Sequence, residues 1–333
     1  MVRQRVLGKT GVKVSELSLG GLFVASFASP LERAKATVSR ALDLGINYVD
    51  TAPTYGNSEE ALGLALEGER RPLVVSTKLG GRPQPFAPRD RACLLASVEE
   101  SLRLLKRDSI DILMIHEPDR PGQYDWWADG EGFRGPVLDV LDELKARGAI
   151  RFTGLGGTTT HELARLVGTG RFDVVLAAYN YSLLWREAEN EVLPAAREMG
   201  MGIILGSPLQ QGALARRWDA QVNTGAPWMS KPRREQFKAL YAYLDETGMD
   251  VAEAGLRFAI SNPDVSTVLM GAASPEEVER NVAAVGKGPL PERVLGRLSE
   301  IAAMVPFRPF EEPFGIGWVL ADPRSYRGPG AAR

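Results

Sequence analysis

Four residues with side chains suited to proton transfer lie at or just beyond the ends of short apolar segments. Asp50 ends the segment INYVD, Lys78 follows LVVST, His116 follows DILMI, and Tyr55 lies in TAPTYG beyond Asp50. A lysine close to a phenol lowers the pKa of the phenol, so Lys78 paired with Asp50 would let Tyr55 donate or accept a proton at ordinary pH. The imidazole of His116 would polarise a carbonyl oxygen or hold it in place.

Each of these residues also has an ordinary interpretation when it is considered alone. Asp50 is suited to cap a helix, a lysine after a strand is usually solvated, and a single tyrosine is usually part of a core or an amphipathic surface. Their joint placement at the ends of successive apolar segments is what predicts a catalytic site.

The segments that must position these residues alternate between short β-rich apolar runs and longer amphipathic patterns. Strands are expected at 17–20, 46–50, 73–77, 111–115, 151–155, 173–178, 202–206 and 266–270, and helices at 31–44, 58–67, 90–106, 136–147, 160–168, 187–199, 232–247 and 275–285. This alternation predicts an α/β fold, a (β/α)8 TIM barrel with buried parallel strands and helices outside. A doubly wound sheet uses the same alternation, so the pattern alone leaves that alternative open.

Several boundaries carry local signals. Ser274 precedes a proline and two glutamates, as an N-cap does, and Gly45 and Gly148 follow helical patterns as C-terminal caps do. The connections 117–135 and 207–231 are long, and loops of this length in a compact domain are often functional. In a barrel, such loops at the carboxyl ends of the strands surround the active site.

The composition argues against several classes of function. The chain has 333 residues and a formal net charge of −2 with mixed signs, so no basic face indicates a nucleic-acid partner. No apolar run approaches the ~20 residues that span a bilayer, and the N-terminus lacks the apolar core of a signal peptide. Cys93 is the only cysteine, and the histidines are His116 and His161, so no disulfide and no metal site are expected. We expect a cytoplasmic protein with one domain over residues 1–333.

Six segments in order resemble the aldo-keto reductases. They are LGKTGVKVSELSLGG, LGINYVDTAPTYG, STKLG, DILMIH, SPLQQG and GAASPEEVERN, and the resemblance runs from about residue 5 to about residue 286. The chain is most similar to the branch of that family that contains L-galactose dehydrogenase and aldose 1-dehydrogenases. The resemblance implies a barrel whose opening segment, 5–16, forms a hairpin that plugs its bottom.

The resemblance also implies roles for the four residues. Tyr55 would be the general acid in reduction and the general base in oxidation, Lys78 paired with Asp50 would tune Tyr55, and His116 would orient the substrate oxygen. Hydride would pass directly between the substrate and a nicotinamide cofactor, so no metal would be needed.

The cofactor contacts of the family fall on less regular positions of this chain. The implied cofactor-binding residues are Gly157, Thr158, Ser207, Leu209, Gly212, Gly271, Ala273, Glu277, Arg280 and Asn281. Many members carry Ser-Asn after the fifth strand, where this chain has Gly156 and Gly157. Many also carry an aromatic residue that stacks on the nicotinamide, where this chain has Gly206.

The segment 271–281 sets cofactor preference in this family. Glu277 stands where NADP-dependent members often have arginine, and a carboxylate repels a 2′-phosphate but accepts a hydrogen bond from a free ribose hydroxyl. Arg280 could restore phosphate binding by turning inward, or could simply pair with Glu277 on the helix surface. We therefore expect NAD to be preferred, with NADP as the alternative.

The connection after His116 bears on the substrate. Glu117 and Asp119 would hydrogen-bond hydroxyl groups, and Trp126 and Trp127 would stack on a sugar face. Alternatively, the tryptophans pack the loop onto the barrel rim.

The resemblance favours an oxidoreductase that passes a hydride between nicotinamide and a sugar or other small carbonyl compound, above all an aldose 1-dehydrogenase for a sugar like L-galactose or L-fucose. An NADPH-dependent aldehyde or ketone reductase would use the same residues, and a cofactor-binding regulatory subunit of a channel is a further alternative. The tail 306–333, rich in Pro, Gly and aromatic residues, would cover the barrel mouth or be disordered. The substrate, the direction and the oligomeric state stay open.

Overall fold

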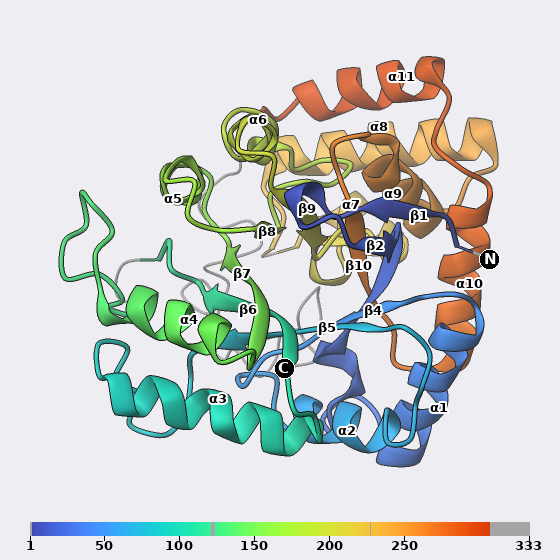
Figure 1. Cartoon of the computed structure of the whole chain (residues 1–333). Coiled ribbons are helices and arrows are strands. Elements are labelled where there is room, and N and C mark those ends of the chain that lie inside the picture. The colour runs from blue at the N-terminus through green and yellow to red at the C-terminus, as the bar shows by residue number, and fades with distance from the viewer. Residues whose placement is uncertain (1, 121–123, 227, 307–333) are drawn as a thin grey trace.

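The computed structural model describes residues 2–120, 124–226 and 228–306, which form a closed barrel of parallel strands. The eight barrel strands are β3 (Leu17–Gly20), β4 (Tyr48–Asp50), β5 (Val74–Leu79), β6 (Ile110–His116), β7 (Ile150–Gly157), β8 (Val174–Ala178), β9 (Gly202–Gly206) and β10 (Thr267–Gly271). They follow one another in chain order, and β10 pairs with β3 to close the barrel (Figure 1). The predicted TIM barrel is confirmed, and the doubly wound alternative is wrong because an open sheet has no such closing pair.

Helices surround the strands on the outside (Figure 1). They are α1 (Leu31–Asp43), α2 (Ser58–Ala65), α3 (Arg91–Leu105), α4 (Pro136–Ala146), α5 (His161–Gly168), α6 (Val192–Glu198), α7 (Asp219–Thr224), α8 (Lys231–Thr247), α9 (Val251–Ser261), α10 (Pro275–Gly286) and α11 (Glu292–Ala303), with 3-10 turns η1 (Gly8–Thr10), η2 (Gly21–Val24), η3 (Glu187–Glu189) and η4 (Gln210–Gly212). The expected helix 187–199 is divided into η3 and α6. Pro194 explains the division, because its ring excludes a helical carbonyl four residues earlier.

The barrel strands separate two apolar layers, as their alternating side chains require. Tyr48, Ile112, Met114 and Leu176 belong to one cluster, and the residues between them belong to a larger cluster that also contains helix residues. The smaller cluster therefore fills the barrel interior, and the larger one lies between the strands and the helices. Because side chains alternate along a strand, every second residue faces the barrel interior, and we call this odd or even position of a residue its parity.

A hairpin closes the barrel at the end where the strands begin. Its strands are β1 (Gln4–Val6) and β2 (Lys13–Ser15), and its residues Leu7 and Val14 are fully buried in the interior cluster. The approach to β9 is so close that a Cβ on Gly8 would lie 2.2 Å from the amide nitrogen of Gly202. This confirms the plugging hairpin that the resemblance implied for residues 5–16.

The helix ends follow the signals in the sequence. The Ser274 hydroxyl accepts a hydrogen bond from the Glu277 amide at 3.3 Å, so Ser274 is the N-cap of α10. Gly45 and Gly148 have φ of 93° and 71°, the left-handed region in which helices often end.

Two expectations concern the chain as a whole. No helix in the described ranges is both long and apolar enough to cross a membrane. The proposed cover of the barrel mouth by the tail 306–333 concerns residues that lie, from 307 onward, outside the described ranges.

Candidate active site

The parity of the strands brings three of the predicted site residues into the barrel interior at its carboxyl end. Asp50 is two residues beyond Tyr48, and His116 two beyond Met114, and both of these neighbours are interior. On β5, Lys78 lies two residues beyond Ser76, and Ser76 pairs with Asp50. The side chains of Asp50, Lys78 and His116 are all buried and therefore converge at the barrel mouth.

Lys78 links these residues. Its Nζ donates to Asp50 Oδ2 at 2.7 Å and to the carbonyl oxygen of Thr51 at 2.8 Å. The same nitrogen lies 4.8 Å from the centre of the Tyr55 ring, so its positive charge acts directly on the phenol. An ammonium has three N–H donors, and Asp50 and Thr51 accept from two of them.

The charge on Lys78 is fixed by its carboxylate partner. Burial disfavours the ammonium, but the charges and hydrogen bonds of Asp50 and Tyr55 outweigh burial and raise the pKa of Lys78 above its ordinary value. Lys78 is therefore a cation at neutral pH, held beside the Tyr55 phenol.

The sequence led us to expect a lowered pKa for Tyr55, but in the structure the net shift is upward. Burial raises this pKa, the positive charge of Lys78 lowers it, and the negative charge of Asp50 raises it, with a net increase. The lowering by Lys78 is real but smaller than the cost of placing a phenolate in this environment. Tyr55 is thus protonated at neutral pH, the form that a general acid needs.

His116 faces Tyr55 across the mouth. The two rings meet edge to face, with centroids 6.1 Å apart. Burial, assisted by the nearby charge of Lys78, lowers the pKa of His116 to about 3. The imidazole is therefore neutral, and its buried Nδ1 has no hydrogen-bond partner among the described residues. A neutral imidazole can donate one hydrogen bond to a carbonyl oxygen in the mouth.

The other half of the mouth is lined by the smallest residues. The last interior positions of the remaining strands are Gly20, Gly156, Ala178, Gly206 and Gly271. A Cβ on Gly206 would lie 2.8 Å from Leu176 Cδ2, and one on Gly271 would lie 2.6 Å from Phe23 Cδ2. Glycine backbone and one alanine therefore line this half of the mouth, with Leu176 and Phe23 packed directly against the backbone of Gly206 and Gly271.

The loop after β7, which holds the predicted cofactor residues Gly157 and Thr158, is organised by Asp119. Asp119 Oδ2 accepts from the amides of Thr158 and Thr159 at 2.8 and 2.6 Å and from Thr159 Oγ1 at 2.7 Å. A Cβ on Gly157 would lie 2.8 Å from this same oxygen, so the carboxylate occupies the space that a side chain would need. Asp119 is fully buried, and it supports this loop rather than presenting its carboxylate on an open surface.

The connection after β9 is conformationally strained where the family resemblance places the pyrophosphate. Ser207, Gln210 and Gln211 have φ of 53°, 52° and 52°, values that non-glycine residues adopt rarely. Of the seven such residues in the described ranges, five follow β6, β8 or β9 at the barrel mouth. Strain of this kind gathers at functional sites. Within this connection, Leu209 packs against Gly255 of α9, and the Gly212 carbonyl accepts from Trp218.

The segment 271–281 leads from β10 into α10. Glu277 Oε2 accepts from the Ala273 amide at 2.8 Å, which fixes the carboxylate at the start of the helix. Arg280 is exposed, and no ion pair joins it to Glu277 in the described part of the chain. Asn281 lies beside Met270, its Nδ2 3.5 Å from the sulfur. The surface pair considered for Arg280 is therefore not formed.

The tryptophans after His116 pack their loop onto the barrel. Trp126 is fully buried and donates to the His116 carbonyl at 3.2 Å, and Trp127 donates to the Pro118 carbonyl at 3.0 Å. Of the two alternatives for these residues, this geometry favours packing over stacking on a sugar. Glu117 is partly exposed and pairs with Arg120 at 3.3 Å.

The comparisons with known proteins agree with this geometry. The model of the aldo/keto reductase family matches residues 16–303. The chain belongs to the aldo-keto reductase family. It is 32% identical to L-galactose dehydrogenase of Arabidopsis thaliana, over 95% of this chain and 98% of that protein. It is 30% identical to an NADH-specific methylglyoxal reductase of Escherichia coli, over 84% of this chain and 92% of that protein.

A solved structure agrees as well. The fold matches an aldo-keto reductase of Bacillus halodurans in its holo form with a TM-score of 0.73 and 26% identity, covering 90% of this chain and 96% of that one. The family assignment made from the sequence is thus confirmed.

Some residues of this aldo-keto reductase site were not predicted from the sequence. Tyr179 follows β8 with φ of 68°, and its hydroxyl accepts from Gln211 Nε2 at 2.8 Å. Asn180 Nδ2 donates to the Thr158 carbonyl at 2.7 Å. Both follow an apolar strand directly, so the rule that selected Asp50 and His116 could have found them. Ser76, within β5, carries no such signal.

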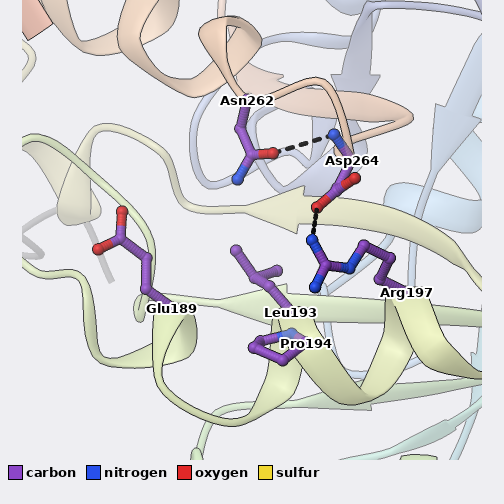
Figure 2. Close-up of a pocket in the computed structure, with 6 residues that line it drawn as sticks. All are labelled: Glu189, Leu193, Pro194, Arg197, Asn262 and Asp264. Carbon is purple, nitrogen blue, oxygen red and sulfur yellow. Dashed lines mark hydrogen bonds and ion pairs between the residues drawn. The ribbon is translucent and has the colours of Figure 1, made fainter.

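A separate hollow of about 160 Å³ lies outside the aldo-keto reductase site (Figure 2). Its lining residues are Glu189, Leu193, Pro194, Arg197, Asn262 and Asp264, and Arg197 pairs with Asp264 at 3.7 Å. Arg197 and Asp264 precede β9 and β10, whereas the site residues lie at the carboxyl ends of strands. The hollow therefore belongs to the opposite end of the barrel.

Proposed function

We propose that this chain is an NAD-dependent oxidoreductase that acts as an aldose 1-dehydrogenase, oxidising the anomeric carbon of a small sugar. The observation that carries the proposal is the contact set of Lys78, whose ammonium binds Asp50 and Thr51 and touches the Tyr55 phenol beside a neutral His116. That set can move a proton at one oxygen atom, which is what carbonyl reduction and alcohol oxidation both require.

Tyr55 is the proposed proton donor and acceptor. In oxidation, its oxygen takes the proton of the substrate hydroxyl, and in reduction it returns that proton to the carbonyl oxygen. Lys78 stabilises the tyrosinate in either direction, and Asp50 keeps Lys78 charged. His116 donates a hydrogen bond that holds the substrate oxygen within reach of Tyr55.

The glycine-lined half of the mouth fits a nicotinamide cofactor, which supplies or accepts the hydride when bound. At Gly206 and Gly271 the strand ends present bare backbone, against which Leu176 and Phe23 pack. We assign Gly157 and Thr158 to the carboxamide end. Ser207, Leu209 and Gly212 are assigned to the pyrophosphate, and Gly271, Ala273, Glu277, Arg280 and Asn281 to the adenosine end.

The preference for NAD rests on Glu277. Its carboxylate is held by the Ala273 amide through Oε2, which leaves Oε1 to accept a hydrogen bond from a ribose hydroxyl. A 2′-phosphate at that place would meet a fixed negative charge. The relative named as an NADH-specific reductase supports the same choice.

The sugar class rests on the relatives as well as on the site. L-Galactose dehydrogenase and a D-threo-aldose 1-dehydrogenase are among the relatives, and both names describe oxidation of an aldose. We assign the partly exposed Glu117, next to His116, to accept hydrogen bonds from sugar hydroxyls.

A spectrophotometric screen of cofactor reduction tests the proposal. Aldoses are offered at mildly alkaline pH with NAD and with NADP separately, and Tyr55→Phe is the matched control. Reduction of NAD by one sugar, lost in the variant, is the expected result. Oxidation of NADPH by simple aldehydes, with no response to any sugar, would instead establish the general reductase and overturn both the cofactor and the substrate assignment.

A further inference from the structure

The carboxylate of Asp50 is held from two sides. Oδ2 accepts from Lys78, and Oδ1 accepts from the Ser76 hydroxyl at 2.6 Å. Ser76 is the cross-strand partner of Asp50, and both residues are buried. The strand pairing therefore brings this hydroxyl to the one carboxylate oxygen that Lys78 does not use.

A second hydroxyl continues the contact into the barrel. Tyr48 OH lies 2.9 Å from Ser76 Oγ, and the Tyr48 side chain is fully buried. Ser76 has a single proton, and it is committed to the carboxylate, which can only accept. Tyr48 must therefore be the donor to Ser76. Burial and the charge of Asp50 raise the pKa of Tyr48 well above its ordinary value, so this phenol keeps its proton.

The two hydroxyls thus form an ordered chain, Tyr48 to Ser76 to Asp50, that ends on the partner of Lys78. We propose that Ser76, supported by Tyr48, is a positioning group that fixes the Asp50 carboxylate and through it the Lys78–Tyr55 contact. This inference deepens the proposed function and rests on it. Neither residue touches the reacting atoms, and both act through Asp50.

The direction of the effect follows from the charges around Tyr55. The charged or titratable groups that act on Tyr55 are Lys78, Asp50 and Tyr179. In addition, Lys78 acts on His116, and Asp111 acts on Tyr48. Without Ser76, Asp50 Oδ1 is a buried acceptor with no donor, so the carboxylate is held from one side only and its hold on Lys78 loosens. Among the charges near Tyr55, Lys78 has the largest effect and lowers its pKa, so a looser Lys78–Tyr55 contact raises that pKa.

The test is the alkaline titration of Tyr55 in the full chain, followed by NMR of carbon-labelled tyrosine and assigned with Tyr55→Phe. Ser76→Ala is expected to move the onset of Tyr55 ionisation up by on the order of one pH unit. Ser18→Ala is the matched control, because Ser18 is also a buried serine inside the barrel but hydrogen-bonds to Ser15 and Thr267 instead of Asp50. An onset equal to that of the control, or a lower one, would overturn the inference.

Tyr48→Phe is the second variant, for the case in which Ser76→Ala does not fold. It removes only the donor to Ser76, so a smaller shift in the same direction is expected, and no shift overturns the role of Tyr48. Where a sugar substrate is found, kcat/KM of Ser76→Ala for oxidation falls about tenfold at a fixed pH below the transition, with the Kd of NAD unchanged. The titration needs neither substrate nor cofactor, so absence of turnover in the unaltered chain refutes the proposed function without deciding this inference.

Discussion

Lys78 shows how a buried cation is kept charged by its neighbours. Its ammonium donates to one carboxylate and one carbonyl and lies beside one phenol, and the charge of Asp50 keeps it protonated despite burial. Removing one partner of a buried ion pair leaves an uncompensated charge, which costs more than the pair itself contributes. Substitutions of Asp50 or Lys78 therefore disturb folding as well as catalysis, and they are poor probes of mechanism.

Tyr55→Phe tests the role of a single side chain more cleanly than substitutions of Asp50 or Lys78. The variant keeps the ring beside Lys78 and removes only the hydroxyl, so the proton donor is lost with little change in packing. We expect turnover to fall by about a hundredfold or more. Steady-state kinetics measure the fall, and the Kd of NAD, which should stay within a few-fold, is the control. An undiminished rate would refute the assigned role.

The neutral state of His116 makes stability depend on pH. The unfolded chain binds a proton at this residue below its ordinary pKa of 6.5, whereas the folded chain does not until about pH 3. Well above pH 6.5, His116 is neutral in both the folded and the unfolded chain, so it adds nothing to the pH dependence of the free energy of unfolding. As the pH falls from 6.5 towards 3, the free energy of unfolding decreases by up to about 1.4 kcal/mol per pH unit through this group.

Denaturant unfolding of the unaltered chain and of His116→Gln, each at several pH values, isolates this contribution. The free energy of unfolding of the unaltered chain should fall more steeply between pH 6.5 and 4.5 than that of the variant, in which the group cannot titrate. Parallel curves would show that His116 is protonated in the folded state as readily as in the unfolded one.

At the scale of elements, the loop after β7 depends on a residue from the loop after β6. Asp119 accepts hydrogen bonds from Thr158 and Thr159, and Asn180, from beyond β8, binds the Thr158 carbonyl. Loops from neighbouring strands thus fix one short segment in advance. A segment that is already ordered loses less conformational entropy when a ligand binds.

Asp119→Ala should therefore weaken NAD binding by about tenfold, because the loop must then be ordered on binding. Asp119→Asn keeps one acceptor oxygen and should weaken it less. Titration calorimetry of both variants gives the Kd of NAD. An unchanged Kd with a higher KM for the sugar would instead support the direct substrate contact that the sequence suggested for Asp119.

The barrel elements were largely predictable, and the reason is physical. Parallel strands buried on both faces give apolar runs, and a polar residue directly after such a run, as at Asp50 or His116, stands out. Helix α9 was missed because it is buried on several sides, with Leu256, Phe258 and Ile260 all covered, so its polar stripe, Glu253, Arg257 and Ser261, is narrow. Nor could the sequence show that Asp119 turns toward Thr158, since a loop conformation decides this.

At the scale of the whole molecule, stability and chemistry lie at opposite ends of the barrel. The hairpin β1–β2 buries Leu7 and Val14 beneath the interior cluster, while the proton-transferring groups lie at the carboxyl ends of the strands. Arg5 attaches this hairpin to the end of α9 by hydrogen bonds to the carbonyls of Ile260 and Asn262. Changes in the hairpin should therefore alter stability with little effect on the site.

Leu7→Ala tests this separation. Leu7 is fully buried, so the substitution should lower the free energy of unfolding by about 2–5 kcal/mol. The value of kcat below the unfolding transition should change little. Chemical denaturation and steady-state kinetics on the same preparation measure both. A large loss of kcat in a chain that remains folded would show that the two ends are coupled.

The pairing of β3 with β10 has a consequence for how the chain is made. Leu17 pairs with Val268, so β3, which is synthesised early, has no partner on this edge until β10 has been synthesised near the end of the chain. At about 5–20 residues per second, the edge of β3 stays open for on the order of ten seconds or more. An open strand edge offers its amides and carbonyls to other chains. Fragments that end before β10 are therefore expected to aggregate rather than to form a smaller barrel.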